Sequence, residues 1–146
     1  MGGFFGVVSD SDCVDDLFYG IDYHSHLGNQ RGGMMVQGDK GFTRVIHDIR
    51  HDQFRSKFEC ELERLHGKIG IGSISDFDDQ PLTIAGRIGK FGITTVAKVN
   101  NLTQLKEEAF ALAKAHFSEM AGDDVSPTEI IASLICQKES FAEGIR

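Results

Sequence analysis

Glycine residues divide this sequence into short apolar runs, and proline is rare. The chain of 146 residues contains 17 glycines and 2 prolines. Glycine adopts positive φ values and lets two backbones approach closely, so it suits tight connections between strands. The pattern therefore predicts strands at most of the apolar runs. These runs are residues 3–8, 33–36, 42–49, 69–72, 82–87 and 91–97.

Other segments have the spacing of amphipathic helices. The clearest early one follows Asp12 and runs out near Gly28, with an apolar face and two acidic residues in its first turn. Later, Ser126 and Pro127 supply an N-cap and a first helical residue, and Glu129 completes a capping box. The expected helices are residues 12–28, 56–65, 101–122, a helix starting after Ser126, and a short segment in 139–146. Their apolar faces include Val14, Leu17, Phe18 and Ile21 in the first helix and Leu102, Leu105, Ala109, Leu112 and Met120 in the third.

The charge balance narrows the choice of partners. The formal net charge is −7, with 15 basic and 22 acidic side chains. Nucleic acids and anionic membranes attract basic patches, so neither is expected as a partner. The sequence has no apolar run of about 20 residues and no signal peptide, which predicts a single cytoplasmic domain with one core.

The side chains with metal-binding or thiol chemistry have no recognised spacing. Three cysteines, 13, 60 and 136, are an odd number without a C-x-x-C pair, which predicts free thiols. The histidine pairs 24/26 and 47/51 lack matching ligands, so neither a metal nor a cofactor is expected. The acidic run at residues 76–79 does not follow a calcium-loop pattern and is interpreted as a solvated loop.

The order and spacing of five segments point to a known family. They are MGGFFGVV (1–8), FYGIDYHSHLGNQRGGMMV (18–36), GKIGIGSISDFDDQPLTI (67–84), FGITTVAKVNNLTQLKEE (91–108) and SPTEIIASLI (126–135). Together they resemble the glutaminase domains of class II glutamine amidotransferases, especially those of the amidophosphoribosyltransferase family. The resemblance implies an α+β fold, an Ntn-hydrolase-like sandwich of antiparallel sheets flanked by helices. Residues 1–146 would form a partial domain that is truncated on its C-terminal side.

The same resemblance implies that the catalytic residues have been replaced. The family's nucleophilic cysteine corresponds to Gly2, and the arginine that binds the substrate carboxylate corresponds to Ser75, which is followed by Asp76. The Asn-Gly pair of the oxyanion hole corresponds to Val99 and Asn100. The acidic residue that holds the substrate amine corresponds to Pro127, and a further arginine corresponds to Leu27. Losing one oxyanion donor alone typically lowers the rate by about 10² to 10³.

These replacements leave three hypotheses for function. The first is a glutaminase-like domain that does not hydrolyse glutamine and has a structural or regulatory role, with a small-molecule ligand in the remodelled pocket. The second is part of an active amidophosphoribosyltransferase that uses ammonia or an altered donor. The third is an interaction module that forms homo-oligomers through exposed strand edges. Under the first two hypotheses, the parent protein carries a C-terminal phosphoribosyltransferase domain that this chain lacks.

Overall fold

The protein, described by a computed structural model, divides into two compact units. Residues 2–28, 30–111, 120–121 and 124–146 are described. One unit comprises residues 1–83 and 92–96, and the other comprises residues 84–91 and 97–146. Chain length had predicted one core. The large apolar cluster belongs to the first unit.

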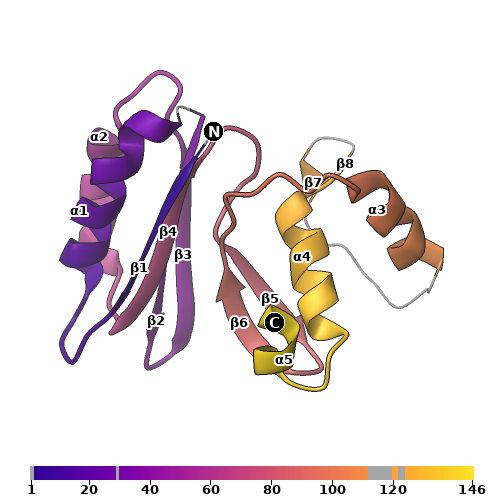
Figure 1. Ribbon diagram of the computed structural model, residues 1–146. Coiled ribbons are helices and arrows are strands. Elements are labelled where there is room, and N and C mark those ends of the chain that lie inside the picture. Colours follow the sequence, from indigo (N-terminus) through magenta and orange to yellow (C-terminus); the bar gives the residue numbers. More distant parts are fainter. Residues whose placement is uncertain (1, 29, 112–119, 122–123) are drawn as a thin grey trace. The chain divides into compact units, whose positions relative to one another are not determined.

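The first unit is built on a four-stranded antiparallel sheet in the order β1-β4-β2-β3 (Figure 1). Its strands are β1 (Gly3–Val8), β2 (Arg31–Gly38), β3 (Gly41–Asp48) and β4 (Ile69–Ser75). Gly41 joins β2 to β3 with φ at +107°, a left-handed conformation that a side chain would strain. The predicted strands at the first four apolar runs are therefore confirmed, and β4 extends three residues further than expected.

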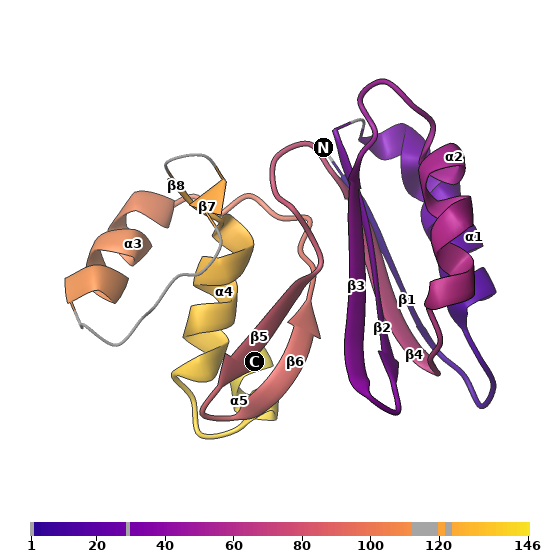
Figure 2. The same ribbon diagram turned by 180° about the vertical axis from the view of Figure 1, so that it is seen from behind.

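Helix α1 (Val14–His24) and helix α2 (Phe54–Phe58) cover one face of this sheet, as seen from both sides in Figures 1 and 2. The four apolar residues predicted for the first helix are all buried. Two 3₁₀ turns, η1 (Ser25–Leu27) and η2 (Glu59–Arg64), follow the two helices. The single helix expected over residues 56–65 is thus a short α-helix followed by a 3₁₀ turn.

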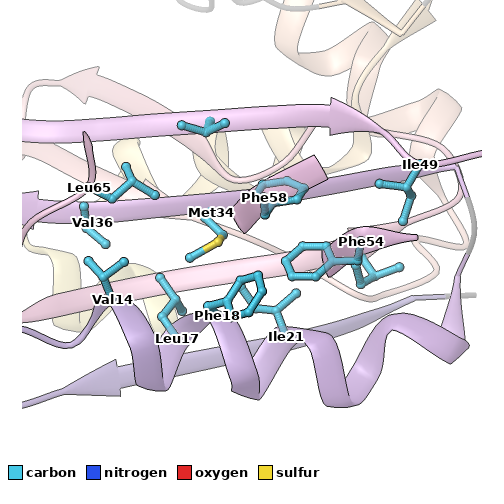
Figure 3. Close-up of a cluster of buried hydrophobic side chains, with 12 residues drawn as sticks. Val14, Leu17, Phe18, Ile21, Met34, Val36, Ile49, Phe54, Phe58 and Leu65 are labelled. Atoms are coloured by element: carbon cyan, nitrogen blue, oxygen red, sulfur yellow. The ribbon is translucent and has the colours of Figure 1, made fainter. Parts of the chain in front are cut away.

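The core of the first unit lies between these helices and the sheet (Figure 3). The rings of Phe54 and Phe58 stack at 4.3 Å between centroids, and Phe18 of α1 packs on Phe54 at 5.7 Å. Leu17 lies close above β4 because Gly70 has no side chain there, and a Cβ at Gly70 would be 2.8 Å from Leu17 Cδ2. The glycines of β4 therefore set how closely α1 approaches the sheet.

Asp12 fixes the start of α1. Its Oδ1 accepts a hydrogen bond from the Val14 amide at 3.0 Å, and its Oδ2 accepts one from the Gly67 amide at 3.1 Å. Burial acts to raise the pKa of Asp12, but these two hydrogen bonds, with His66 nearby, outweigh it and lower the pKa. The Asp12 carboxylate therefore ties the first residue of α1 to the segment before β4.

The second unit is mainly helical. It contains α3 (Leu102–Ala111), α4 (Pro127–Cys136) and α5 (Phe141–Ile145), with the short strands β7 (Met120–Ala121) and β8 (Asp124–Val125). The hydroxyl of Ser126 accepts a hydrogen bond from the Thr128 amide at 3.2 Å, which confirms the predicted N-cap. The prediction of one helix to residue 122 is wrong at Met120, which pairs with Val125 in a strand; residues 112–119 lie outside the described ones.

A separate two-stranded sheet follows β4 along the chain. It consists of β5 (Leu82–Gly86) and β6 (Gly89–Ile93). The strands predicted at residues 82–87 and 91–97 are confirmed, although β6 begins earlier and ends at Ile93. All three cysteines are free, as expected.

Candidate functional site

Gly2 and Ser75 lie together at one end of the first unit. These are the positions where the family resemblance predicts that the nucleophilic cysteine and the substrate-binding arginine have been replaced. Gly2 precedes β1, beside the last residues of β4. A Cβ built on Gly2 would lie 3.6 Å from Ser75 Cα and much closer than 3.0 Å to the carbonyl oxygen of Ile74. Real Cβ atoms essentially never come that close, so this position has no room for a side chain unless the backbone moves.

Leu27 joins this group from η1. A Cβ at Gly3 would lie 3.0 Å from Leu27 Cδ1 and 3.0 Å from His24 Cβ. The segment after α1 therefore packs against the beginning of β1. The structure brings Gly2, Leu27 and Ser75 together, although they lie far apart in the sequence.

Ser75 uses its hydroxyl to hold the loop that follows β4. Its Oγ accepts hydrogen bonds from the amides of Phe77 at 3.2 Å and Asp78 at 3.0 Å. Asp76 is half-buried, and Asp78 is only 6% exposed. The expectation of a fully solvated acidic loop is therefore wrong at Asp78, because Ser75 draws the loop back onto the end of the strand.

Ser73 lies two residues earlier on the same face of β4. It is 1% exposed, and its Oγ has no hydrogen-bond partner among the described residues. Its neighbour across the sheet is Gly33 of β2, where a Cβ would lie 2.7 Å from the carbonyl carbon of Gln80. The backbone of Gln80 thus covers β2 next to this hydroxyl. The Gln80 side chain in turn accepts hydrogen bonds from Thr94 Oγ1 at 2.8 Å and the Thr95 amide at 2.7 Å.

Arg31 is a cation that the sequence interpretation did not single out. It is paired directly with Ser75 in the β2–β4 register. Its Nε lies 3.1 Å from Asp79 Oδ1, and its NH1 lies 3.3 Å from Asp48 Oδ2. The sequence gives no signal for this role, because the pairing of positions 31 and 75 depends on strand order.

Asp48 is also hydrogen-bonded to Arg50. The side chain of Arg50 donates to both carboxylate oxygens, and its amide donates to Oδ1 at 2.9 Å. These hydrogen bonds, with the charges of Arg50 and Arg31, hold the pKa of Asp48 well below its usual range. At the end of the sheet beside Ser75, the guanidinium groups of Arg31 and Arg50 are therefore engaged by the carboxylates of Asp48 and Asp79.

Three of the predicted site residues belong to the second unit. Val99 is half-buried and Asn100 is exposed, just before α3. Pro127 is the first residue of α4, so it takes part in starting a helix. The prediction that these residues share a pocket with Gly2 and Ser75 stays a prediction.

Cys13 has the wrong environment for a substitute nucleophile. It is fully buried between α1 and β4, and a Cβ on Gly70 would lie 3.5 Å from its sulfur. Burial, with the neighbouring charge of Asp12, raises the pKa of the Cys13 thiol. The reactive form of cysteine is the thiolate, so both effects make this sulfur less nucleophilic.

His47 takes part in a polar contact within the first unit. His47 Nε2 lies 3.1 Å from Glu61 Oε1, and Glu61 Oε2 accepts from Arg64 at 2.7 Å. No group of three or more histidine, cysteine or acidic residues in the described segments is arranged to hold a metal ion. No helix in those segments is both long and apolar enough to cross a bilayer.

Two solved structures show the same fold. A glutamine phosphoribosylpyrophosphate (PRPP) amidotransferase from B. subtilis, complexed with ADP and GMP, matches with a TM-score of 0.78 and 21% identity over 99% of this chain. A structure described as the allosteric regulatory enzyme of purine biosynthesis matches with a TM-score of 0.80, again at 21% identity over 99% of the chain. This chain has the PRPP amidotransferase fold. The predicted α+β, Ntn-hydrolase-like architecture is thereby confirmed.

The match is limited in two ways. The chain spans about a third of each solved structure, 31% of the first and 32% of the second. No family model matches the sequence, and no curated protein does. The likeness to PRPP amidotransferases therefore establishes the fold, and the chemistry must be argued from the residues.

Proposed function

We propose that this chain is the glutaminase-like domain of a cytoplasmic protein related to amidophosphoribosyltransferase, and that it does not hydrolyse glutamine. The observation that carries the proposal is Gly2. This residue supplies no nucleophile, and the carbonyl of Ile74 occupies the space that a side chain would need. An acyl-transfer reaction of this type requires a thiolate or hydroxyl at the attacking position.

Two further observations support the loss of glutaminase chemistry. The Ser75 hydroxyl is engaged by the amides of Phe77 and Asp78, so it does not replace an arginine as a carboxylate ligand. The buried thiol of Cys13 has a raised pKa, so it does not replace the missing cysteine. The domain needs no cofactor in this role, and its partner in the parent protein is a phosphoribosyltransferase domain.

The remodelled end of the sheet is proposed to bind a small molecule. The buried Ser73 Oγ has no hydrogen-bond partner among the described residues, which costs free energy that a ligand group would recover. Arg31 supplies a guanidinium two residues before Gly33, the β2 residue that is paired with Ser73. Its ion-pair partner Asp79 is exposed and lies in the loop after β4. The ligand would therefore present a hydrogen-bonding group and an anionic group.

The test of the catalytic proposal is a glutaminase assay on the purified chain, with the B. subtilis PRPP amidotransferase as the positive control. Release of glutamate from L-glutamine should stay at the level of the no-enzyme blank. Hydrolysis at a rate near that of the positive control would overturn the proposal.

The test of the ligand proposal is an NMR titration of the chain with L-glutamate as the probe. Amide shifts should move at residues 73–79 and at Arg31, and the Arg31→Gln variant should lose the response. The matched control is Arg50→Gln, which removes the other cation paired with Asp48. A titration without shifts in that region, or with equal shifts in both variants, contradicts the assignment.

A further inference from the structure

A carboxylate of the chain itself already occupies Arg31. The Arg31 Nε lies 3.1 Å from Asp79 Oδ1, and the two side chains are 37% and 56% exposed. Asp48 also reaches this guanidinium, but its carboxylate is shared with Arg50. Asp79 therefore supplies, from within the chain, the kind of anionic group that the proposed ligand would bring to Arg31.

Arg31 and the buried Ser73 hydroxyl lie on the same face of the sheet. Arg31 is two residues before Gly33, which is paired with Ser73 in the β2–β4 register, and residues two apart on a strand share a face. The spacing of strands and residues puts the Cα atoms of Arg31 and Ser73 about 8 Å apart. A small organic anion spans that distance, so one molecule is able to reach both groups if Asp79 leaves the guanidinium.

The residues on either side of Asp79 are held in place. The Asp78 amide donates to Ser75 Oγ at 3.0 Å, and Asp78 is 6% exposed. On the other side, Gln80 is buried, and its Oε1 accepts a hydrogen bond from Thr94 Oγ1 at 2.8 Å. Asp79 is thus an exposed residue between two anchored ones. Its carboxylate can leave the guanidinium by a change of side-chain rotamer, without movement of the loop backbone.

The contact between Arg31 and Asp79 is easily broken. Both side chains are partly exposed, so water and salt screen their attraction, and ion pairs of this kind contribute little net free energy. Ser73 Oγ has no hydrogen-bond partner among the described residues, so Asp79 does not satisfy it. A ligand that reaches both Arg31 and Ser73 therefore makes a hydrogen bond that Asp79 does not make.

We propose that Asp79 is an internal competitor at this site: its carboxylate occupies Arg31 in the free chain and leaves when an anionic ligand binds. This inference rests on the ligand site proposed above, and it concerns the regulation of that site. When the binding-competent state of a protein is only partly populated, the apparent affinity for the ligand falls by that fraction. The ion pair therefore sets the ligand concentration at which the site fills, and it favours small carboxylates that also carry a hydrogen-bonding group.

The first test is the variant Asp79→Asn, in which an amide of similar size replaces the carboxylate. The side chain is exposed, so the fold should survive, and circular dichroism melting checks this. L-Glutamate, titrated into the full chain and followed by NMR, should bind about two- to fivefold more tightly to the variant than to the native chain, the range expected for an exposed ion pair.

Asp39→Asn is the matched control for the change in net charge. It removes an exposed carboxylate from the turn between β2 and β3, at the opposite end of β2 from Arg31. Eight residues of strand separate the two positions by about 25 Å, well beyond the screening length at physiological salt. The affinity for L-glutamate should therefore be the same in Asp39→Asn as in the native chain.

A second measurement separates competition from general repulsion, because removing any carboxylate near Arg31 favours an anionic ligand. During the titration of the native chain, the carboxyl carbon signal of Asp79 should move toward that of the exposed Asp39 as the site fills.

The possible results distinguish this inference from the ligand proposal on which it rests. If L-glutamate binds at residues 73–79 and Arg31, but Asp79→Asn binds it no more tightly than Asp39→Asn, Asp79 is not a competitor and the ligand site stands without it. The same holds if the carboxyl signal of Asp79 stays fixed while the site fills. If neither the native chain nor Asp79→Asn responds to L-glutamate, the ligand site itself is wrong and this inference falls with it.

Discussion

The substitution Gly2→Ala tests whether position 2 has room for any side chain. Replacing Gly2 by alanine adds one Cβ directly against the Ile74 carbonyl oxygen, inside the 3.0 Å limit that real Cβ atoms respect. That oxygen belongs to the backbone of β4, which is paired on both sides by β1 and β2. The sheet cannot yield locally, so the start of β1 must move.

The magnitude follows from the cost of overpacking. Forcing extra atoms into a packed site typically costs about 1–3 kcal/mol. A loss of about 2 kcal/mol lowers the folding equilibrium constant by roughly 30-fold, and lowers the melting temperature of a domain of this size by about 4–8 °C. Gly2→Ala should therefore melt several degrees below the native chain.

Gly6 provides a matched control on the same strand. A Cβ there would lie 3.7 Å from Ile71 Cγ2 and 3.8 Å from the Gly70 carbonyl oxygen, which are ordinary contacts. Gly6→Ala should thus leave stability unchanged or raise it slightly, because alanine loses less conformational freedom on folding. Urea unfolding of the two variants measures the difference. If their unfolding free energies agree within about 0.5 kcal/mol, the steric argument is refuted.

The same argument predicts that restoring the sulfur does not restore the activity. Gly2→Cys, with its N-terminus checked by mass spectrometry, should show no glutamine hydrolysis above the blank. The thiol would be displaced by the Ile74 carbonyl, and the segment that resembles the oxyanion hole has Val99 where the family has an asparagine. Hydrolysis at the rate of the B. subtilis enzyme would show that the loss rests on one residue.

Other substitutions test the fold around the site. Phe58→Ala should destabilise the first unit by about 3–5 kcal/mol, measured by urea unfolding, because the ring is fully buried in a phenylalanine stack. Gly72→Ala should lower the unfolding free energy more than Gly41→Ser in the same assay. A Cβ at position 72 would lie 2.7 Å from the Gly33 carbonyl oxygen inside the sheet, whereas a side chain at position 41 meets open space and is strained only by the positive φ. Asp12→Ala should cost about 1 kcal/mol at pH 7, at the scale of a lost helix cap. The pKa of Asp12 is lower in the folded chain, so the stabilisation by this carboxylate is complete above the pKa of the unfolded state, about 4. It decreases as the pH falls through the folded pKa. A difference in unfolding free energy between the native chain and Asp12→Ala that persists undiminished at low pH would contradict this argument.

Much of the local structure follows directly from the sequence. The alternation of apolar and turn residues predicted β1 to β6, and the spacing of Val14, Leu17, Phe18 and Ile21 predicted the buried face of α1. Ser126 marked the start of α4 through its capping chemistry. These signals are local, since a cap or an apolar stripe depends on residues within one or two turns. The pattern failed at Met120, where helical spacing continued but the chain pairs as a strand with Val125.

The sequence alone determined most of the elements and, through five ordered segments, the fold that the solved structures confirm. Tertiary structure alone decided which strands are neighbours. The order β1-β4-β2-β3 brings Gly2 to Ser75 and sets Arg31 opposite it, although neither pairing leaves a trace in local periodicity. It also places β1, an uncharged strand, at one end of the strand order of the described sheet. Strand pairing joins segments that are distant along the chain, so its consequences for a site or a surface emerge only when the sheet is assembled.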